Sequence, residues 1–102
     1  MDIYFEVKAS TGKVIRTTRS HWELIVKLKH PEIDGKENVV KECLSNPSEV
    51  RKSSDDSDVY LYYLAYEKYY ICVIVRHLNG DGFIITAYIT DRIKEGESIW
   101  KK

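Results

Sequence analysis

YLYYLAYEKYYICVIVRHLNGDGFIITAYIT, residues Tyr60–Thr90, decides the fold of this chain. It contains three apolar runs that are rich in β-branched and aromatic residues, which suit a pleated and half-buried strand. Two short segments, Glu67-Lys68 and the turn-forming Asn79–Gly82, can make the hairpin connections between these runs. The stretch therefore predicts an antiparallel meander with strands at Tyr60–Tyr66, Tyr69–Val75 and Phe83–Thr90.

Side chains alternate between the two faces along a strand, so each run should have a dry core face and a mixed face. For the last run, this alternation predicts two sets, with Phe83, Ile85, Ala87 and Ile89 on one face and Ile84, Thr86, Tyr88 and Thr90 on the other. The mixed faces carry hydroxyl groups and a cation on rigid strands. We therefore expect functional residues on these mixed faces.

The remaining chain contains weaker strand and helix signals. Ser20 and Asp34 are good helix N-caps, and each is followed three residues later by a glutamate that completes a capping box. The first helix should stop before Pro31, which disfavours helical geometry in the residue that precedes it. The predicted elements are strands Ile3–Lys8 and Lys13–Thr17, helices His21–His30 and Gly35–Ser45, strand Ser48–Ser54, and a helical turn within the tail Asp91–Lys102.

This order predicts an α+β fold with one domain over residues 1–102. An N-terminal hairpin (1–18) and two helices (19–45) would pack on a four-stranded antiparallel β-meander (48–90), followed by a tail (91–102). In the first helix, Leu24 and Leu28 should widen the apolar stripe formed around Trp22 and Ile25.

Composition narrows the function classes. The 102 residues carry 16 basic and 16 acidic side chains, so the chain is not a globally basic nucleic-acid binder. Residues 1–30 nevertheless hold six Lys and Arg against three acids, which could meet phosphate locally. No apolar run approaches the roughly 20 residues that span a bilayer, and no signal peptide is recognisable. We expect a cytoplasmic protein in which Cys43 and Cys72 are reduced and buried.

The sequence contains no metal motif, phosphate loop, dinucleotide fingerprint or serine nucleophile elbow, so we expect neither a metal nor a cofactor. It does contain the residue types of metal-free phosphodiester chemistry. Histidine moves protons, arginine clamps phosphate, and strand-borne hydroxyls orient hydrogen bonds. The candidates are His30, Arg51 and Thr86 as catalytic residues and Ser53, Tyr62, Arg76, His77 and Tyr88 as substrate-binding residues.

Each candidate alone also has an ordinary structural explanation. A histidine at a helix C-terminus is favoured by the helix dipole, and Thr and Tyr are favoured in strands. Eight tyrosines could simply form a core or a protein-binding face. Several polar groups, including Arg51, Ser53, Thr86 and Tyr88, should nevertheless converge on one sheet face, and this convergence favours a functional site.

Several segments, IRTTRSHWELI, KHPEI, LSNPSEVRKSSDDSDVYLYY and GFIITAY, resemble the phage- and bacterial-chromosome-associated members of the barnase/EndoU/colicin/RelE-type nuclease superfamily. The most specific pieces are Lys29-His30-Pro31, Asn46-Pro47 before Arg51-x-Ser53, and Thr86-x-Tyr88. The resemblance spans about residues 12–100. It implies two helices followed by a four-stranded antiparallel sheet, and a metal-independent ribonuclease, often a toxin.

The resemblance implies His30 as general acid/base, Arg51 on the phosphate, and Thr86 with Tyr88 on the substrate backbone or transition state. It leaves the role of His21 open. The partners implied are an RNA substrate, such as tRNA or mRNA, and an antitoxin protein. The alternative is a catalytically silent domain of the same fold that binds RNA or protein. In either case, we expect His30 to lie within roughly 10 Å of at least two of Arg51, Thr86 and Tyr88.

Overall fold

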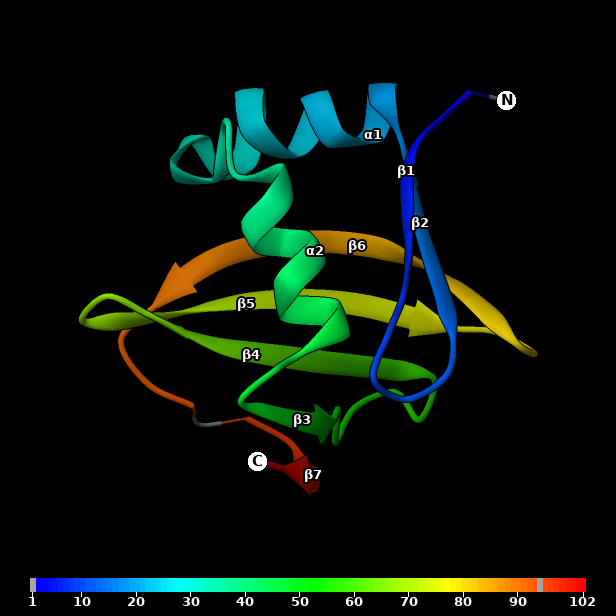
Figure 1. Cartoon of the computed structure of the whole chain (residues 1–102), viewed down its shortest axis with the longest axis vertical. Helices are drawn as coiled ribbons and strands as arrows, with labels where there is room; N and C mark the ends of the chain where they lie inside the picture. The colour runs from blue at the N-terminus through cyan, green and yellow to red at the C-terminus, as the bar shows by residue number, and fades with distance from the viewer. Residues whose placement is uncertain (1, 94) are drawn as a thin grey trace.

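The computed structural model describes residues 2–93 and 95–102. Its strands build one seven-stranded sheet in the order β1-β2-β6-β5-β4-β3-β7, with the helices on one side (Figure 1). The strands are β1 (Ile3–Lys8), β2 (Val14–Thr18), β3 (Glu49–Lys52), β4 (Val59–Tyr66), β5 (Tyr69–His77), β6 (Asp81–Thr90) and β7 (Glu97–Lys101). The helical segments are α1 (Arg19–Leu24), the π-helix η1 (Ile25–Lys29), the 3-10 helix η2 (Pro31–Ile33) and α2 (Glu37–Ser45).

The predicted fold, a four-stranded antiparallel meander with a separate hairpin, is wrong. Strands β3 to β6 do pair antiparallel with their neighbours, but β2 adds to them by pairing parallel with β6 from Val14 to Arg16. The tail, expected to form a helical turn, pairs with β3 as β7. Both additions join segments that are far apart in the sequence, and local turn signals do not predict such pairings. The result is a mixed sheet that includes the N-terminal hairpin.

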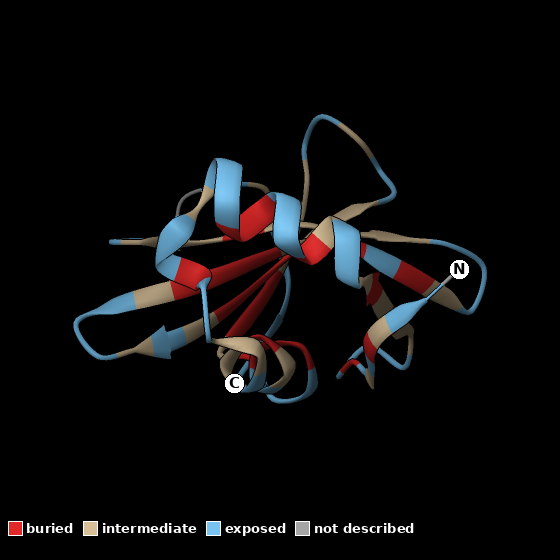
Figure 2. Ribbon diagram, turned by 90° about the horizontal axis from the view of Figure 1, so that it is seen from above, coloured by how far each residue is buried: buried red, intermediate tan, exposed pale blue. Residues whose placement is uncertain are grey.

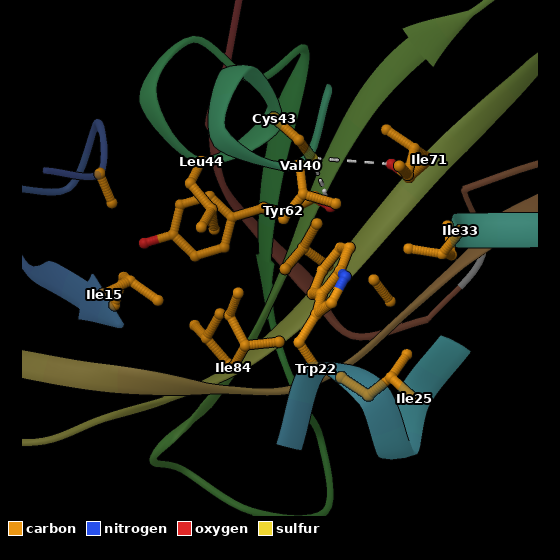
Figure 3. Close-up of a cluster of buried hydrophobic side chains, with 14 of the residues drawn as sticks. Ile15, Trp22, Ile25, Ile33, Val40, Cys43, Leu44, Tyr62, Ile71 and Ile84 are labelled. Atoms are coloured by element: carbon orange, nitrogen blue, oxygen red, sulfur yellow. Dashed lines mark hydrogen bonds between the residues drawn. The ribbon is translucent and has the colours of Figure 1, made fainter. Parts of the chain in front are cut away.

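The core lies between the sheet and the helical segments. The helical side contributes buried side chains that pack against apolar side chains of β2, β5 and β6 (Figure 3). They include Trp22 from α1, Ile25 from η1, and Val40 and Leu44 from α2. Figure 2 shows the same division, with buried positions turned towards the sheet and exposed positions outwards. Burying an aliphatic side chain of this size contributes roughly 1.5–3 kcal/mol, so this layer provides the main drive for folding. Cys43 and Cys72 are both buried and free, as predicted.

The first helix differs from its prediction in a way that matters for His30. Thr18, not Ser20, is the N-cap, because its hydroxyl accepts a hydrogen bond from the His21 amide. After Leu24 the helix widens into a π-turn, in which the His30 amide donates to the Ile25 carbonyl. The wider turn rotates the face of the helix. Leu28, predicted in the apolar stripe, is therefore 75% exposed.

The alternation predicted for the last strand is also wrong at its start. The register of β5 and β6 shifts between Ile74 and Val75, whose partners are Thr86 and Ile84, so Ile85 is an extra, bulged residue. Across such a bulge the side chains change face. Ile84 is consequently buried in the core, while Phe83 is 40% exposed and shares the face of Thr86.

Candidate functional site

The face of the sheet opposite the helices carries part of the predicted site, and we call it the far face. Directly paired residues of neighbouring strands point to the same side, so the far face includes the row Thr86–Ile74–Leu61–Arg51. A small cluster lies beside this row, built on the buried residues Leu61, Tyr63 and Cys72, with Tyr70, Ile74, Tyr88 and Ile93 packed against it.

His30 lies at the edge of β6 and contacts a residue of the far face there. Beyond Phe83, β6 is no longer paired with β2, and the segment around Pro31 lies against it. His30 sits between the π-turn and this segment, with its ring centroid 5.5 Å from that of Tyr88. Its Nδ1 atom lies 3.4 Å from Glu32 Oε2. A carboxylate at Nδ1 fixes the orientation of an imidazole and directs Nε2 towards a substrate.

Thr86 and Tyr88 lie two residues apart on the same face of β6, a spacing of about 6.6 Å along a strand. The Thr86 hydroxyl is buried and has no hydrogen-bond partner among the described residues. Burial raises the pKa of the Tyr88 phenol, which therefore keeps its proton as a donor. The three side chains of His30, Thr86 and Tyr88 together form what we call the His30 site.

Arg51 is not part of the His30 site. It stands three strands from Thr86, about 14 Å at the usual strand spacing. Its Nη1 atom lies 3.2 Å from Glu49 Oε2, while Nε and Nη2 donate to the Gly96 carbonyl at 3.2 and 2.9 Å. Nearby, the Ser53 hydroxyl accepts from the Asp55 amide, and Ser53 lines a cleft of about 350 Å3 with Leu61 and Gly96. Arg51 and Ser53 thus mark the other end of the far face.

Tyr62 and His77 lie on the helix-covered face. The Tyr62 hydroxyl is 2.9 Å from His77 Nε2 and 2.6 Å from Thr11 Oγ1, and Tyr60 stacks on the histidine ring at 3.9 Å. Burial lowers the pKa of His77 to about 4, so the ring is neutral near pH 7. These residues form what we call the His77 cluster, which lies beside the β1–β2 turn.

Arg76, the last substrate-binding candidate, is paired with acids of the loop before β4. Its Nη2 atom lies 2.8 Å from Asp56 Oδ2, and its Nη1 atom 3.8 Å from Asp58 Oδ2. Of the residues predicted to converge on one sheet face, Thr86 and Tyr88 lie together on β6, with His30 against Tyr88, whereas Arg51 with Ser53 lies three strands away. Arg76, and Tyr62 with His77, occupy two further places.

Two residues gain roles that the sequence had not assigned. His21 Nε2 is 2.9 Å from the carbonyl oxygen of Ile85, the bulged residue, so this histidine satisfies a backbone group that the bulge leaves free. Glu32 provides the carboxylate beside His30. Its position two residues after His30, in the KHPEI segment, is the only sequence signal that could have identified it.

Two kinds of feature are absent from the described residues. Within residues 2–93 and 95–102, no group of three or more His, Cys, Asp or Glu side chains is arranged to hold a metal ion. Within the same residues, no helix is long and apolar enough to cross a membrane.

Part of a known protein is similar to this chain. The bifunctional protein GlmU of Bacillus cytotoxicus is 29% identical over 101 residues, which cover 90% of this chain. The chain spans about one fifth of the length of that protein, since the match covers 20% of it. No protein-family profile matches the chain, and no solved structure matches it.

Proposed function

We propose that this protein is a metal-independent endoribonuclease that cleaves RNA through attack of the 2′-hydroxyl. The observation that supports this best is the His30 site: an imidazole 3.4 Å from a Glu32 carboxylate oxygen packs on Tyr88, and the Thr86 hydroxyl on the same strand face is buried with no partner among the described residues. A buried and unsatisfied hydroxyl costs roughly 1–3 kcal/mol, and a substrate oxygen would offset that cost.

In the proposed reaction, His30 Nε2 accepts the proton of the ribose 2′-hydroxyl. The 2′-oxygen then bonds to phosphorus, the bond from phosphorus to the 5′-oxygen breaks, and the products are a 2′,3′-cyclic phosphate and a free 5′-hydroxyl. Tyr88, whose raised pKa keeps the phenol protonated, donates to the leaving 5′-oxygen. Thr86 donates a hydrogen bond to a non-bridging oxygen as negative charge develops on it.

The proposal changes the role of Arg51. Because Arg51 lies about 14 Å from Thr86, it would contact the RNA backbone at the far end of the face, not the reacting phosphate. A single strand that crosses β6, β5, β4 and β3 would meet both places. The nuclease superfamily resemblance supports the reaction class and a toxin-like role in the cytoplasm, with tRNA or mRNA as substrate. An antitoxin would then act by covering the far face.

The decisive experiment compares purified wild type with His30→Ala on tRNA, on mRNA and on a DNA oligonucleotide that contains one ribonucleotide. Removing a general base typically lowers the rate by about 10²–10⁴-fold. We expect that loss, cyclic-phosphate ends on the wild-type product by mass spectrometry, and no change with EDTA. Leu28→Ala, an exposed change in the preceding π-turn, is the matched control and should cleave normally.

Two results would contradict the proposal. Cleavage by His30→Ala at the wild-type rate would remove the histidine from the chemistry. Absence of cleavage by the wild type on every RNA offered, with binding retained, would favour the catalytically silent RNA-binding domain.

A further inference from the structure

A second cleft opens where β2 and β6 separate. The two strands pair in parallel only from Val14 to Arg16, opposite Asp81 to Phe83, and β2 then leads into α1. Between them lies a cleft of about 340 Å3, lined by Arg16, Thr17, Thr18, His21, Leu78, Gly82, Phe83 and Ile84. A volume of this size is at the lower end of the range for small-molecule sites.

The cleft combines exposed apolar groups with a fixed cation. Phe83 and Leu78 are 40% and 47% exposed, and the bulge at Ile85 is what turns Phe83 out of the core. An aromatic ring exposed in this way offers a flat surface on which another ring can stack. Such stacking favours a planar aromatic ligand over a flexible aliphatic one.

Arg16 brings oriented donors to the same cleft. Its Nη1 atom donates to Asp81 Oδ2 at 2.8 Å, and Glu6 Oε2 lies 3.7 Å from its Nε atom. That Nε atom is buried and has no hydrogen-bond partner among the described residues. Asp81 and Glu6 therefore hold the guanidinium in place. Because Nε is buried, the N–H groups that can meet a ligand are those of Nη2 and the second one of Nη1. These N–H groups select for a ligand edge that carries acceptors.

We propose that this cleft binds a nucleobase of the RNA substrate, with a preference for guanine. The inference rests on the proposed function for its biological ligand. Guanine presents two adjacent acceptors, N7 and O6, and arginine is their most frequent protein partner. The base would stack on Phe83, with its N7/O6 edge towards Arg16. Adenine offers a donor beside N7, and the pyrimidines lack this pair of acceptors.

The position of the cleft agrees with this assignment. Phe83 and Thr86 share the far face and oppose Arg76 and Ile74, which are two residues apart on β5, so they lie about 7 Å apart along the strand. A base stacked on Phe83 would therefore lie close to a phosphate at the His30 site. Lys13 Nζ donates at 3.0 Å to the carbonyl of Leu78, one of the residues that line the cleft. Its charge is available to a neighbouring phosphate.

The test separates binding from cleavage by using 2′-deoxynucleotides, which lack the attacking hydroxyl. We would titrate 15N-labelled protein with dGMP, dAMP, dCMP and dTMP, each to about 10 mM, and follow amide shifts. The expected result is saturable shifts at Gly82 and Ile84, with dGMP binding about tenfold more tightly than dCMP. No saturable shift in the cleft with any of the four nucleotides would overturn the inference. That result would leave the cleft to an apolar protein side chain.

Variants identify the contacts. Phe83→Ala should weaken dGMP binding about tenfold, and Phe83→Tyr should retain it, because base stacking needs only an aromatic face. Tyr69→Ala, which removes an equally exposed aromatic ring at the β4–β5 turn, is the matched control and should bind normally. Arg16→Lys should keep the charge but lose the preference for guanine, since an ammonium lacks the fork. Unchanged affinity in Phe83→Ala would overturn the stacking contact.

The outcomes distinguish this inference from the proposed function. Binding of dGMP in the cleft without cleavage of any RNA would support the base site and reject the nuclease. Cleavage that depends on His30, with no nucleotide binding in the cleft and equal rates after all four bases, would support the nuclease and reject the base site.

Discussion

The sheet carries a histidine in contact with a tyrosine on each of its faces, and the two pairs differ in how completely their polar atoms are used. In the His77 cluster, the Tyr62 hydroxyl lies between His77 Nε2 and Thr11 Oγ1 in one continuous network. In the His30 site, the Thr86 hydroxyl beside Tyr88 is buried without a partner among the described residues. A satisfied network stabilises the fold, whereas an unsatisfied one retains the capacity to bind.

The comparison assigns opposite roles to residue types that look alike in the sequence. Tyr62 and His77 were predicted to bind substrate, yet the contacts they make tie the β1–β2 turn to β4 and β5. His30 directly follows the π-helix η1, and Tyr88 lies on β6 three residues after the bulged Ile85. Single π-helical turns often occur at functional sites. If this distinction holds, changes at the His30 site should affect catalysis, and changes in the His77 cluster should affect stability.

Among the changes that test this contrast, Thr86→Val should have the largest effect. Valine has nearly the shape of threonine but lacks the hydroxyl, so RNA cleavage should fall by about 10²–10³-fold, as for other lost transition-state donors. The free energy of unfolding should stay constant or rise, because an unsatisfied buried group is removed. Cleavage assays and urea denaturation measure the two quantities. Thr90→Val is the control, because the Thr90 hydroxyl on the same strand donates only an exposed hydrogen bond to the Arg92 carbonyl. The cleavage rate and the free energy of unfolding of this variant should stay near those of wild type.

A smaller effect, of the opposite kind, is expected for Tyr62→Phe. Loss of the hydroxyl leaves Thr11 Oγ1 and His77 Nε2 without their partner in a part-buried setting. The free energy of unfolding should drop by about 1–3 kcal/mol, while RNA cleavage stays within twofold of wild type. Tyr69→Phe, an exposed position, controls for loss of a phenol. A large loss of cleavage without loss of stability would break the comparison and return Tyr62 to the substrate site.

These contrasts also show what the sequence could and could not predict. Local signals located the strands between residues 60 and 90, because β-branched runs and short turns act over neighbouring residues. The parallel pairing of β2 with β6 and the addition of β7 to β3 join distant segments, and their registers depend on the completed core. The sequence therefore predicted most strands but assembled them into the wrong sheet.

The same limit applies to the site. Thr86 and Tyr88 share a face because they are two residues apart, which alternation alone predicts. Arg51 was predicted beside them only because the alternation of side chains puts it on the same face. Alternation does not give the number of strands between two residues. The exposure of Phe83 depends on a one-residue bulge opposite Ile74 and Val75, which reverses the alternation and which no residue type in this stretch announces.

The smallest expected effect is the response of stability to pH, and it tests the His77 cluster directly. Burial lowers the pKa of His77 from its ordinary value of 6.5 to about 4. Between these two pH values, the unfolded chain binds a proton that the folded chain does not. Acid therefore favours unfolding, and the stability contributed by neutral His77 is present above pH 6.5 and is lost as the pH falls towards 4.

We expect the melting temperature of wild type to fall more steeply between about pH 7 and pH 4.5 than that of His77→Gln, which cannot titrate there. The carboxylates titrate in both proteins, so the difference between the two curves isolates the histidine. The effect should be modest, because His77 is only part-buried and solvent offsets some of the cost of its charge. Leu28→Ala, at an exposed position that does not titrate, is the matched control and should keep the wild-type slope. Parallel curves for wild type and His77→Gln would show that the cluster tolerates a charged imidazole, and the contrast between the two histidines would then fail.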